Sequence, residues 1–326
     1  METIIMPIDR ALIQSELKPE LRLRATNRAG NEIYIVTWQN APHVVREVGR
    51  LREIAFRAAG GGTGLACDLD EFDICDNPYH QLIVWSPEDE EILGGYRFFP
   101  GARCRFRPDG QPHLATSHIF HFSDDFIRNY LPYTVELGRS FVSLDYQSTR
   151  QMHKSIFALD NLWDGLGALT IVIPEMKYFF GKMTMYPSFH RQARDLILHF
   201  LHKHFPDADG LVMPVSPLMP ETSPHILETM LPYSDLRTDY RELNTKVRCF
   251  GLNIPPLFNA YMSLSPTMRC LGTAINRNFG NVEETGILIA TEEILEEKIM
   301  RHVDSYMNEH PSTMQQFMHL FMPDGC

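Results

Sequence analysis

Residues 134–146 read TVELGRSFVSLDY, and the interpretation of the whole chain starts from this stretch. Its apolar positions follow the pattern of a buried β-strand. They are Val135, Leu137, Phe141, Val142 and Leu144. Glu136 and Arg139 interrupt this run with opposite charges, three residues apart. A charge inside a protein must be paired or used in chemistry, because its removal from water is costly.

Arg97 and the acidic pair Asp70 and Asp73 are the partners that we expect for these two charges. Two interpretations are open at this point. The charges can form a structural ion network that also includes Arg52, or they can line a catalytic site. Asp70 and Asp73 can also act as caps of a helix in the acidic link between two elements.

The totals of the chain exclude some classes of partner. The 326 residues carry a formal net charge of −11, which argues against nucleic acid as the main partner. Hydrophobic residues make up 44%, which is ordinary for a folded core. Residues 97–107 carry four arginines and no acid, so this segment would suit an acidic protein. Six cysteines without a CxxC spacing indicate reduced thiols.

The sequence carries neither a recognisable signal peptide nor an apolar run of the ~20 residues that a spanning helix requires. We therefore expect a cytoplasmic protein. An apolar stripe near the C-terminus can pack on the domain or on a second copy, or it can touch the inner membrane as a peripheral contact. Its residues are Met314, Phe317, Met318, Phe321 and Met322.

Hydrophobic periodicity predicts a mixture of strands and helices. Strands are expected at 33–38, 81–85, 91–98, 113–122, around Glu136, and at 177–186, 211–215 and 285–290. Helices are expected at 7–17, 42–59, 148–173, 187–205, 239–248, 256–264 and 292–307. The glycines from Gly60 to Gly64 predict a flexible turn or lid. This order favours an α+β fold with a mixed, mostly antiparallel sheet flanked by helices.

The same patterns predict three parts of the chain. Residues 1–29 form an N-terminal arm, 30–215 the main domain and 216–326 a C-terminal extension packed on it. The segment after residue 215 is rich in proline, and we expect it to run as an extended excursion.

Four motifs occur in order along the chain: Arg52-x3-Phe56, Asp70-x2-Asp73, GGYRF at 94–98, and Glu136-x2-Arg139-x2-Val142. They resemble the charged signature of the acyl-homoserine-lactone synthases in the GNAT acyltransferase superfamily. The segments ELGRSFV, LWDGLGALT, YFFGKMTMYPS and NIPPLFNAYMSLSP are more similar to the ornithine-lipid type, haemolysin-like N-acyltransferases. That group has glycine N-acyltransferases among its bacterial relatives. The resemblance implies a GNAT-like fold.

The resemblance also implies a reaction. An acyl or 3-hydroxyacyl chain would pass from the thioester of acyl carrier protein to the α-amine of a small amino acid, glycine or ornithine, as the first step of aminolipid synthesis. Residues 146–154 contain no glycine and so lack the pyrophosphate loop by which many members of the superfamily grip coenzyme A. This favours a carrier-protein donor. We expect no bound cofactor.

Such aminolysis needs a base, because the amine of an amino acid is mostly protonated at pH 7. Glu136 is the first candidate for the base and Asp73 the second. Arg139 and Arg97 can hold the carboxylate of the acceptor. Backbone N–H groups near Ser140, Phe141 and Val142, freed by a bulge, can form the oxyanion hole. Tyr178 or Tyr186 can protonate the leaving thiolate.

Other residues enter the expected site through the family motifs. Arg52, Phe56 and Asp70 fall at motif positions near the substrates, although Arg52 can instead pack and pair. Arg103, Arg105 and Arg107 can dock the acidic carrier protein, or they can form a solvated loop.

Several alternatives use other features. An acyl-homoserine-lactone-like synthase would need S-adenosylmethionine as its acceptor, and a haemolysin-like protein would act on membranes without catalysis. His190-x4-Asp195 has the spacing of the glycerolipid O-acyltransferase motif, but the second block of that family is missing. The sequence shows no HExxH pattern, so no metal is expected.

Overall fold

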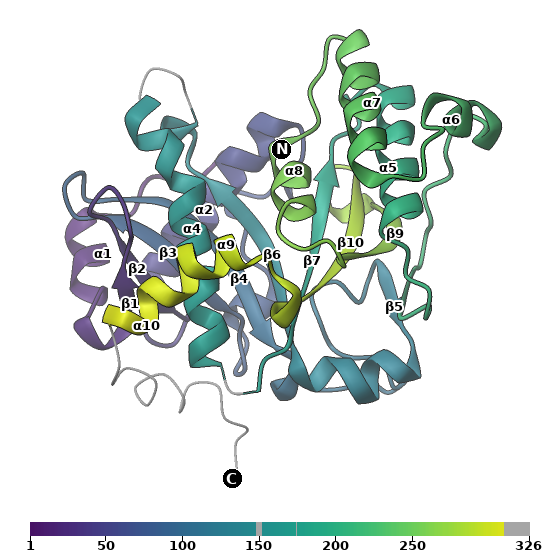
Figure 1. Ribbon diagram of the computed structural model, residues 1–326. Coiled ribbons are helices and arrows are strands. Elements are labelled where there is room, and N and C mark those ends of the chain that lie inside the picture. Colours follow the sequence, from purple (N-terminus) through teal and green to yellow (C-terminus); the bar gives the residue numbers. More distant parts are fainter. Residues whose placement is uncertain (148–151, 174, 310–326) are drawn as a thin grey trace.

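The structure is a computed structural model that describes residues 1–147, 152–173 and 175–309. Its centre is an eight-stranded sheet with the order β1-β2-β3-β4-β6-β7-β10-β9 (Figure 1). Neighbouring strands are antiparallel except β6 and β7, which are parallel. The strands are β1 Arg22–Ala25, β2 Glu32–Val36, β3 His80–Ser86, β4 Glu91–Pro100, β6 Thr134–Val142, β7 Tyr178–Met185, β9 Arg269–Asn276 and β10 Val282–Ala290. A small second sheet pairs β5 (Phe120–Phe122) with β8 (Val212–Pro214).

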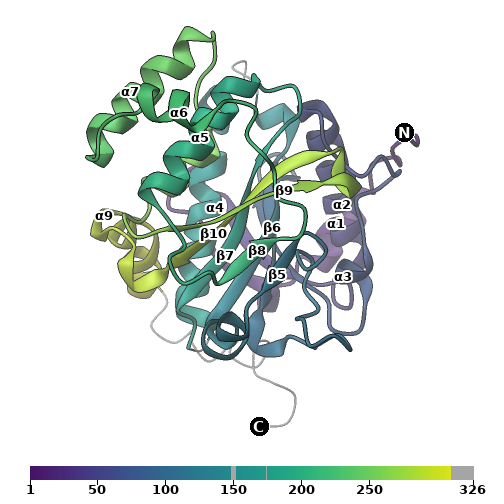
Figure 2. The ribbon, with the colours of Figure 1, turned by 90° about the vertical axis from the view of Figure 1, so that its right-hand side faces the viewer.

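Helices cover both faces of the main sheet. They are α1 Arg10–Glu16, α2 Pro42–Ala59, α3 Glu71–Ile74, α4 Met152–Val172, α5 Arg191–His204, α6 Pro224–Met230, α7 Leu236–Cys249, α8 Pro256–Met262, α9 Glu296–Ile299 and α10 Ser305–Glu309. Figure 2 shows α1 and α2 on one flank of the sheet and α5 to α7 on the other. This arrangement confirms the α+β class, with a mostly antiparallel sheet.

Each face of the sheet has its own cover. One face packs its apolar side chains on α4, α5 and α8 in a single large cluster that includes Leu82, Leu166 and Phe179. The opposite face is divided. Helices α1 and α2 cover its β2–β4 half, and segment 114–131 together with β8 covers the half around β7, β9 and β10. The candidate site lies between these two covers.

Helix α2 shows how local sequence sets the boundaries of an element. Pro42 occupies its first turn, where its missing N–H costs nothing. Gly60 ends it in the left-handed conformation, with a φ of 93°. The prediction of a helix at 42–59 is confirmed.

One prediction was wrong for most of its length, and another is confirmed with different bounds. Only Phe120–Phe122 of the predicted 113–122 strand is extended, because Ser117 and Phe120 donate their N–H groups to nearby carbonyls in turns. The predicted 292–307 helix is confirmed from Glu296 onward, where α9, a wide helical turn at Met300–Asp304 and α10 follow one another without a gap.

The sequence analysis missed the strands β1 and β9 and the helix α6. Strand β9 is short of strong β-formers and is kinked at Gly272, whose φ is 87°. Helix α6 lies in the proline-rich segment, where Ser223 caps it and Pro224 occupies its first position. A proline there starts a helix rather than breaking it, so this signal was available in the sequence.

The main sheet is continuous across both predicted part boundaries. It takes β1 from the predicted arm 1–29 and β9 and β10 from the predicted extension 216–326. The C-terminal part therefore contributes strands to the domain in addition to packing on it.

None of the helices in the described ranges is both long and apolar enough to cross a membrane. The apolar stripe from Met314 to Met322 lies outside the described residues, so the expected membrane contact there stays a prediction.

Gly167 in α4 gives a test of the packing between α4 and the C-terminal helices. A Cβ at this position would lie 2.6 Å from the carbonyl oxygen of His302. Gly→Ala within a helix normally stabilises it by roughly 1 kcal/mol. We expect Gly167→Ala to lower the free energy of unfolding instead, by about 1–3 kcal/mol, because the backbone at His302 must move. Urea denaturation measures this change.

The control for Gly167→Ala is Thr245→Ala, at an exposed position of α7. This change should leave the stability unchanged or raise it slightly, since Ala is the better helix former. A Gly167→Ala protein more stable than wild type would contradict the close approach.

Candidate active site

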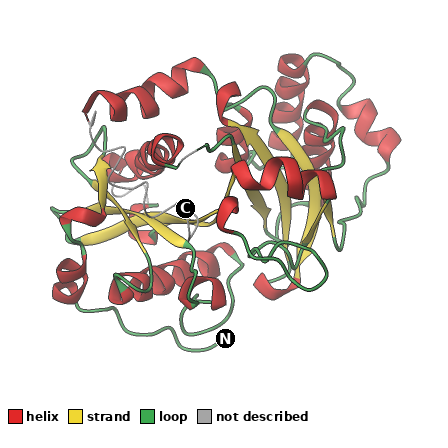
Figure 3. Ribbon diagram, turned by 90° about the horizontal axis from the view of Figure 1, so that it is seen from below, coloured by secondary structure: helices red, strands yellow, loops and turns green. Residues whose placement is uncertain are grey.

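The site is built at the parallel pair of strands in the centre of the sheet. Strands β6 and β7 are in register only from Thr134 to Glu136, opposite Tyr178 to Phe180. Beyond these pairs, β6 continues to Val142 and β7 to Met185, but the two strands no longer pair with each other. Seen from below, the strands gather in two groups that spread apart (Figure 3). The sheet is therefore open along the C-terminal halves of β6 and β7.

A bulge in β6 lies at this opening, as the sequence analysis expected. Arg97 pairs with Gly138 and Gly95 with Phe141, so Arg139 and Ser140 together face the single residue Tyr96. Arg139 has a φ of 48°, in the left-handed region. The bulge changes the direction of the Arg139 backbone next to the gap.

Two cavities meet at the opening. The larger, of about 610 Å³, lies between the loop at Thr63 and Leu65, the start of α3 and segment 113–118. The smaller, of about 230 Å³, lies between β6, β7 and α8. Both are lined by Gly138, Arg139, Lys182 and Phe279. A molecule in one cavity can therefore meet a molecule in the other through the gap between the strands.

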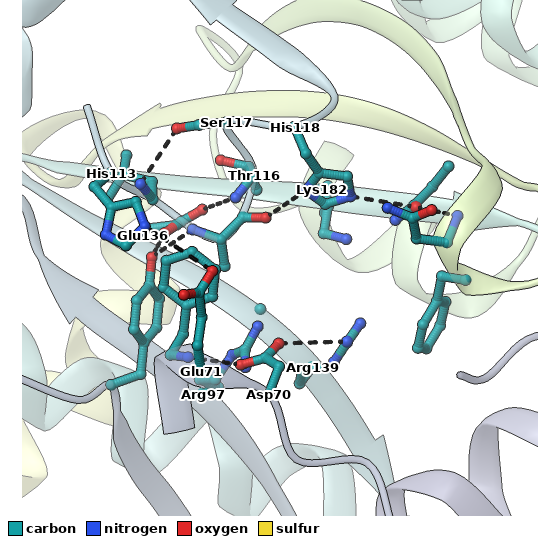
Figure 4. Close-up of a pocket in the computed structure, with 18 of the residues that line it drawn as sticks. Asp70, Glu71, Arg97, His113, Thr116, Ser117, His118, Glu136, Arg139 and Lys182 are labelled. Atoms are coloured by element: carbon teal, nitrogen blue, oxygen red, sulfur yellow. Dashed lines mark hydrogen bonds and ion pairs between the residues drawn. The ribbon is translucent and has the colours of Figure 1, made fainter. Parts of the chain in front are cut away.

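Glu136 faces the larger cavity and is nearly fully buried (Figure 4). The hydroxyl of Tyr79 donates to its Oε2, and the backbone N–H of Thr116 donates to its Oε1 at 3.1 Å. Tyr79 is itself oriented, since its oxygen accepts from the N–H of Ala115 at 2.8 Å. Burial raises the pKa of the Glu136 carboxyl above its ordinary value, and the hydrogen bonds from Thr116 and Tyr79 oppose that rise only in part. Such a carboxylate suits a base.

Three arginines and three aspartates form an ion network beside Glu136. Its members are Arg52, Asp68, Asp70, Asp73, Arg97 and Arg139. The network joins α2, the loop before α3, α3 itself, β4 and the bulge of β6. The interpretation of these charges as structural partners therefore holds for much of the set.

Asp73 lies at the centre of this network and is fully buried. Its Oδ2 is 2.9 Å from Nη2 of Arg52 and 3.0 Å from Nη1 of Arg97. Burial alone would raise the pKa of Asp73, but these two guanidinium groups hold it well below its usual range. Asp73 lines neither of the two cavities. The geometry therefore gives no support to Asp73 as a second base.

Asp70 and Asp73 also cap α3, which was the alternative expected from the sequence. Asp70 accepts from the N–H of Phe72, and Asp73 accepts from the N–H of Asp70 at 3.1 Å. These two side chains thus cap α3 and also bind the guanidinium of Arg97. Arg97 reaches the larger cavity, but its Nη1 is already bound by both aspartates.

Arg139 is the most accessible arginine of the network, with 13% of its side chain exposed. Its Nε is 3.1 Å from Oδ2 of Asp68, and its guanidinium lies 4.3 Å from the ring centre of Phe279. Arg52, in contrast, is fully buried between Asp68 and Asp73 and lines neither cavity. It holds the site together without reaching it.

The remaining expected residues fall on different sides of the gap. Phe56 packs on Phe279 and lines the smaller cavity together with Ser140. The side chains of Phe141 and Val142 point into the two apolar clusters, so only their backbones can serve an oxyanion hole.

The three arginines expected to dock a carrier protein have separate surroundings. Arg105 is exposed. Arg107 pairs with Asp109 at 3.3 Å and lines the larger cavity. Arg103 is half-buried, with its Nη1 3.4 Å from Nε2 of His80.

The sequence analysis missed three residues that line the larger cavity: Tyr79, Thr116 and Lys182. Lys182 had a signal of the same kind as Glu136, a lone charge in the apolar run YFFGKMTMY. Asp68, also missed, lies in a loop and takes part only through the fold.

His190 and Asp195 are parts of the scaffold. His190 caps α5 and stacks on Phe250 at 4.3 Å. Asp195 is bound by Arg194 and accepts from the N–H groups of Glu221 and Thr222 at 2.8 Å. The described part of the chain holds no group of three or more His, Cys, Asp or Glu side chains that could bind a metal ion.

The ion network predicts a large effect of Arg52 on stability. Replacing it with Met would leave Asp68 and Asp73 buried without one of their cations. We expect Arg52→Met to lower the free energy of unfolding by about 3–5 kcal/mol. Arg128→Met, which breaks an exposed pair with Asp124, is the control and should change stability little. Urea denaturation of both variants checks this, and equal small effects would contradict a structural network.

Comparisons with known proteins agree with this geometry. Residues 51–156 match the family described as the acetyltransferase (GNAT) domain. A glycine N(alpha)-acyltransferase of Phocaeicola vulgatus is 61% identical over 315 residues, 97% of each chain. Another glycine N(alpha)-acyltransferase, of Bacteroides thetaiotaomicron, is 62% identical over 97% of this chain and 94% of that protein.

A solved structure of BjaI, a CoA-dependent acyl-homoserine lactone synthase with SAM and isopentyl-CoA, covers 86% of this chain and 89% of its own. With 12% identity and a TM-score of 0.36, that likeness is weak. The two enzymes that align along almost the whole length identify the family. The chain therefore belongs to the glycine Nα-acyltransferases and is an acyltransferase with a GNAT domain.

Proposed function

We propose that this enzyme moves an acyl or 3-hydroxyacyl chain from the thioester of acyl carrier protein to the α-amine of glycine. The product is an N-acylglycine, which would be the first intermediate of an aminolipid. The observation that carries this proposal is Glu136, a buried carboxylate with a raised pKa that lines the larger cavity, two residues before the opening where the two cavities meet. The names of the two closely similar enzymes support glycine over ornithine as the acceptor.

The smaller cavity suits the thioester arm of the donor. It lies where β6 and β7 have no register with each other, so an extended chain bearing amide groups can pair with a free strand edge there. The pantetheine arm of a carrier protein is such a chain. The thioester carbonyl would then lie near the bulge at Arg139 and Ser140, where backbone N–H groups can stabilise the oxyanion.

The larger cavity would hold the acceptor. Glu136 takes a proton from the ammonium group, and the neutral amine attacks the thioester carbonyl carbon. The N–C bond forms and the C–S bond breaks. The second proton of the amine passes to the leaving thiolate by way of a tyrosine hydroxyl of the smaller cavity, and Glu136 returns the first proton to water. Thr116, which also lines this cavity, hydrogen-bonds to the Glu136 carboxyl and helps to hold it in place.

Tyrosines of the smaller cavity are candidates for protonating the thiolate. Tyr96, Tyr186 and Tyr261 line it, and burial raises the pKa of each, which keeps the hydroxyl groups protonated. Tyr178, the other residue expected in this role, packs on Tyr130 and lines neither cavity. Tyr186 therefore remains a candidate from the sequence, and Tyr261 and Tyr96 join it.

The carrier protein as donor rests on the glycine-free continuation of the chain after Tyr146, part of which lies outside the described residues. The exposed Arg105 and its half-buried neighbours Arg103 and Arg107 give an acidic carrier protein a basic surface to approach. No cofactor is needed in this scheme, since the thioester is a co-substrate. Membership of the glycine Nα-acyltransferases favours this N-acyltransferase scheme over a lactone-like signal synthase that uses S-adenosylmethionine.

Removing the base tests the assignment of Glu136. We expect Glu136→Gln to lower kcat by about 10²- to 10⁴-fold, because the amide cannot accept the ammonium proton. The measurement is release of free thiol from an acyl carrier protein thioester in the presence of glycine. New N-acylglycine in lipid extracts of a bacterium that lacks aminolipids, detected by mass spectrometry, gives a second measurement in cells.

Glu228→Gln is the matched control for that experiment, since Glu228 is exposed on α6 away from both cavities. It should acylate glycine like wild type. Identical activity of the Glu136→Gln and wild-type proteins would show that the base lies elsewhere.

The pH dependence follows from the raised pKa of Glu136. The base works when deprotonated, so kcat/KM should rise with pH through a pKa above the ordinary range of glutamate. Tyr79→Phe removes a hydrogen bond that lowers this pKa. The acidic limb should therefore move to higher pH in the variant. A pH profile of kcat/KM for both proteins measures the shift, and coincident limbs would argue against Glu136 as the titrating group.

A further inference from the structure

Lys182 lies on the same face of the sheet as Glu136, one strand step further along. Glu136 pairs with Phe180 in the parallel register, and paired residues of parallel strands point to the same face. Lys182 follows Phe180 by two residues, so its side chain also emerges on that face. Two residues of a parallel strand span about 6.6 Å. A base and a cation from neighbouring strands thus line the larger cavity (Figure 4).

The ammonium group of Lys182 is bound by one glutamate and has further hydrogen-bond donors. It bonds to Oε1 of Glu284 on β10, whose Oε2 accepts from Nδ2 of Asn276 at 2.8 Å. Glu284 is buried, whereas 14% of the Lys182 side chain is exposed and lines both cavities. An ammonium group has three donors, and Glu284 accepts one of them. The others are available to an anion in the cavity.

The nearby arginines are more firmly bound to acidic partners. Arg97 is paired with Asp70 and Asp73, and only 4% of its side chain is exposed. Arg139 is paired with Asp68 and stacked on Phe279. Four Lys/Arg side chains line the larger cavity: Arg97, Arg107, Arg139 and Lys182. Among the described residues, Arg97 and Arg139 each pair with two aspartates, whereas Arg107 and Lys182 each have one acidic partner. Of these last two, only Lys182 lies on a strand that borders the gap beside Glu136.

We propose that Lys182 binds the carboxylate of the amino-acid acceptor and thereby places the α-amine at Glu136. This inference rests on the proposed acylation of an amino acid. In an α-amino acid the amine and the carboxylate are attached to the same carbon. Glu136 and Lys182 lie on neighbouring strands and line the same cavity, so the two ends of one acceptor can face the base and the cation. Glu284 is a positioning residue, which holds the lysine ammonium in place.

The consequence is selectivity for free α-amino acids. An amine without the carboxylate would lose the contact with Lys182, and it would reach Glu136 without a fixed orientation. Glycinamide is a close analogue, since it differs from glycine only by replacing the carboxylate with a neutral amide. We expect the wild-type enzyme to acylate glycinamide far less well than glycine.

The test combines a change in the enzyme with a change in the substrate. Lys182→Met should lower kcat/KM for glycine by roughly 10- to 100-fold, mostly through KM, because a charge-assisted hydrogen bond is lost. The same variant should acylate glycinamide about as well as wild type does. Lys182→Arg, which keeps the charge, should recover part of the activity with glycine. Lys18→Met, at an exposed lysine far from the cavities, should match wild type with both acceptors.

A second variant separates binding from disturbance of Glu284. Lys182→Met leaves Glu284 buried without its cation, whereas Lys182→Met/Glu284→Gln removes both charges. The loss with glycine should persist in the double variant. Recovery in the double variant would overturn the proposal, because the loss would then arise from the uncompensated glutamate.

Three further outcomes have distinct meanings. An equal loss with glycine and glycinamide would overturn the proposal, since Lys182 would then act on the thioester, which both reactions share. A wild-type enzyme that acylates neither acceptor would overturn the proposed function, and this inference with it. A normal wild-type reaction with an unaffected Lys182→Met variant would overturn this inference alone.

Discussion

The short pairing between β6 and β7 is the constraint on which the site depends. These strands share three register pairs and then separate within a sheet that is otherwise continuous. An unpaired strand edge inside a protein leaves backbone groups that need partners. Here the edge borders two cavities, so an extended ligand can supply those partners. The same separation lets the two cavities meet, which a closed sheet would prevent.

The ion network keeps this opening in shape. A buried cluster of charges adds little net stability compared with apolar packing, but it fixes directions and distances. Asp68 and Asp70 tie the guanidinium of Arg139 to the loop before α3, and Phe279 supports it from the other side of the gap. The strained backbone at Arg139 is held by these contacts. Most of the charged motif is thus scaffold, and Glu136 stands outside it with a different pKa.

Local signals in the sequence predicted much of the fold and part of the site. The signals for a helix start at Pro42 and a helix end at Gly60 predicted α2. A charge in an otherwise apolar strand indicated Glu136. The same argument applied to Lys182 would have found it. Its partner Glu284 lies 102 residues further along, and no local pattern records that contact. Strand β9 was missed because a glycine kink and a bulge hide its alternation, and it forms by pairing with β10.

Charge balance explains why a lysine and a glutamate accompany the base. Burial lowers the pKa of Lys182, and Glu284 opposes this and favours the ammonium form. In the proposed reaction, the proton transfer to Glu136 neutralises both the ammonium group of the acceptor and the carboxylate of Glu136. The acceptor carboxylate keeps its negative charge, and the total charge in the cavity does not change. A cation next to that carboxylate attracts it both before and after the transfer, so Lys182 can hold the acceptor in place while its amine becomes neutral.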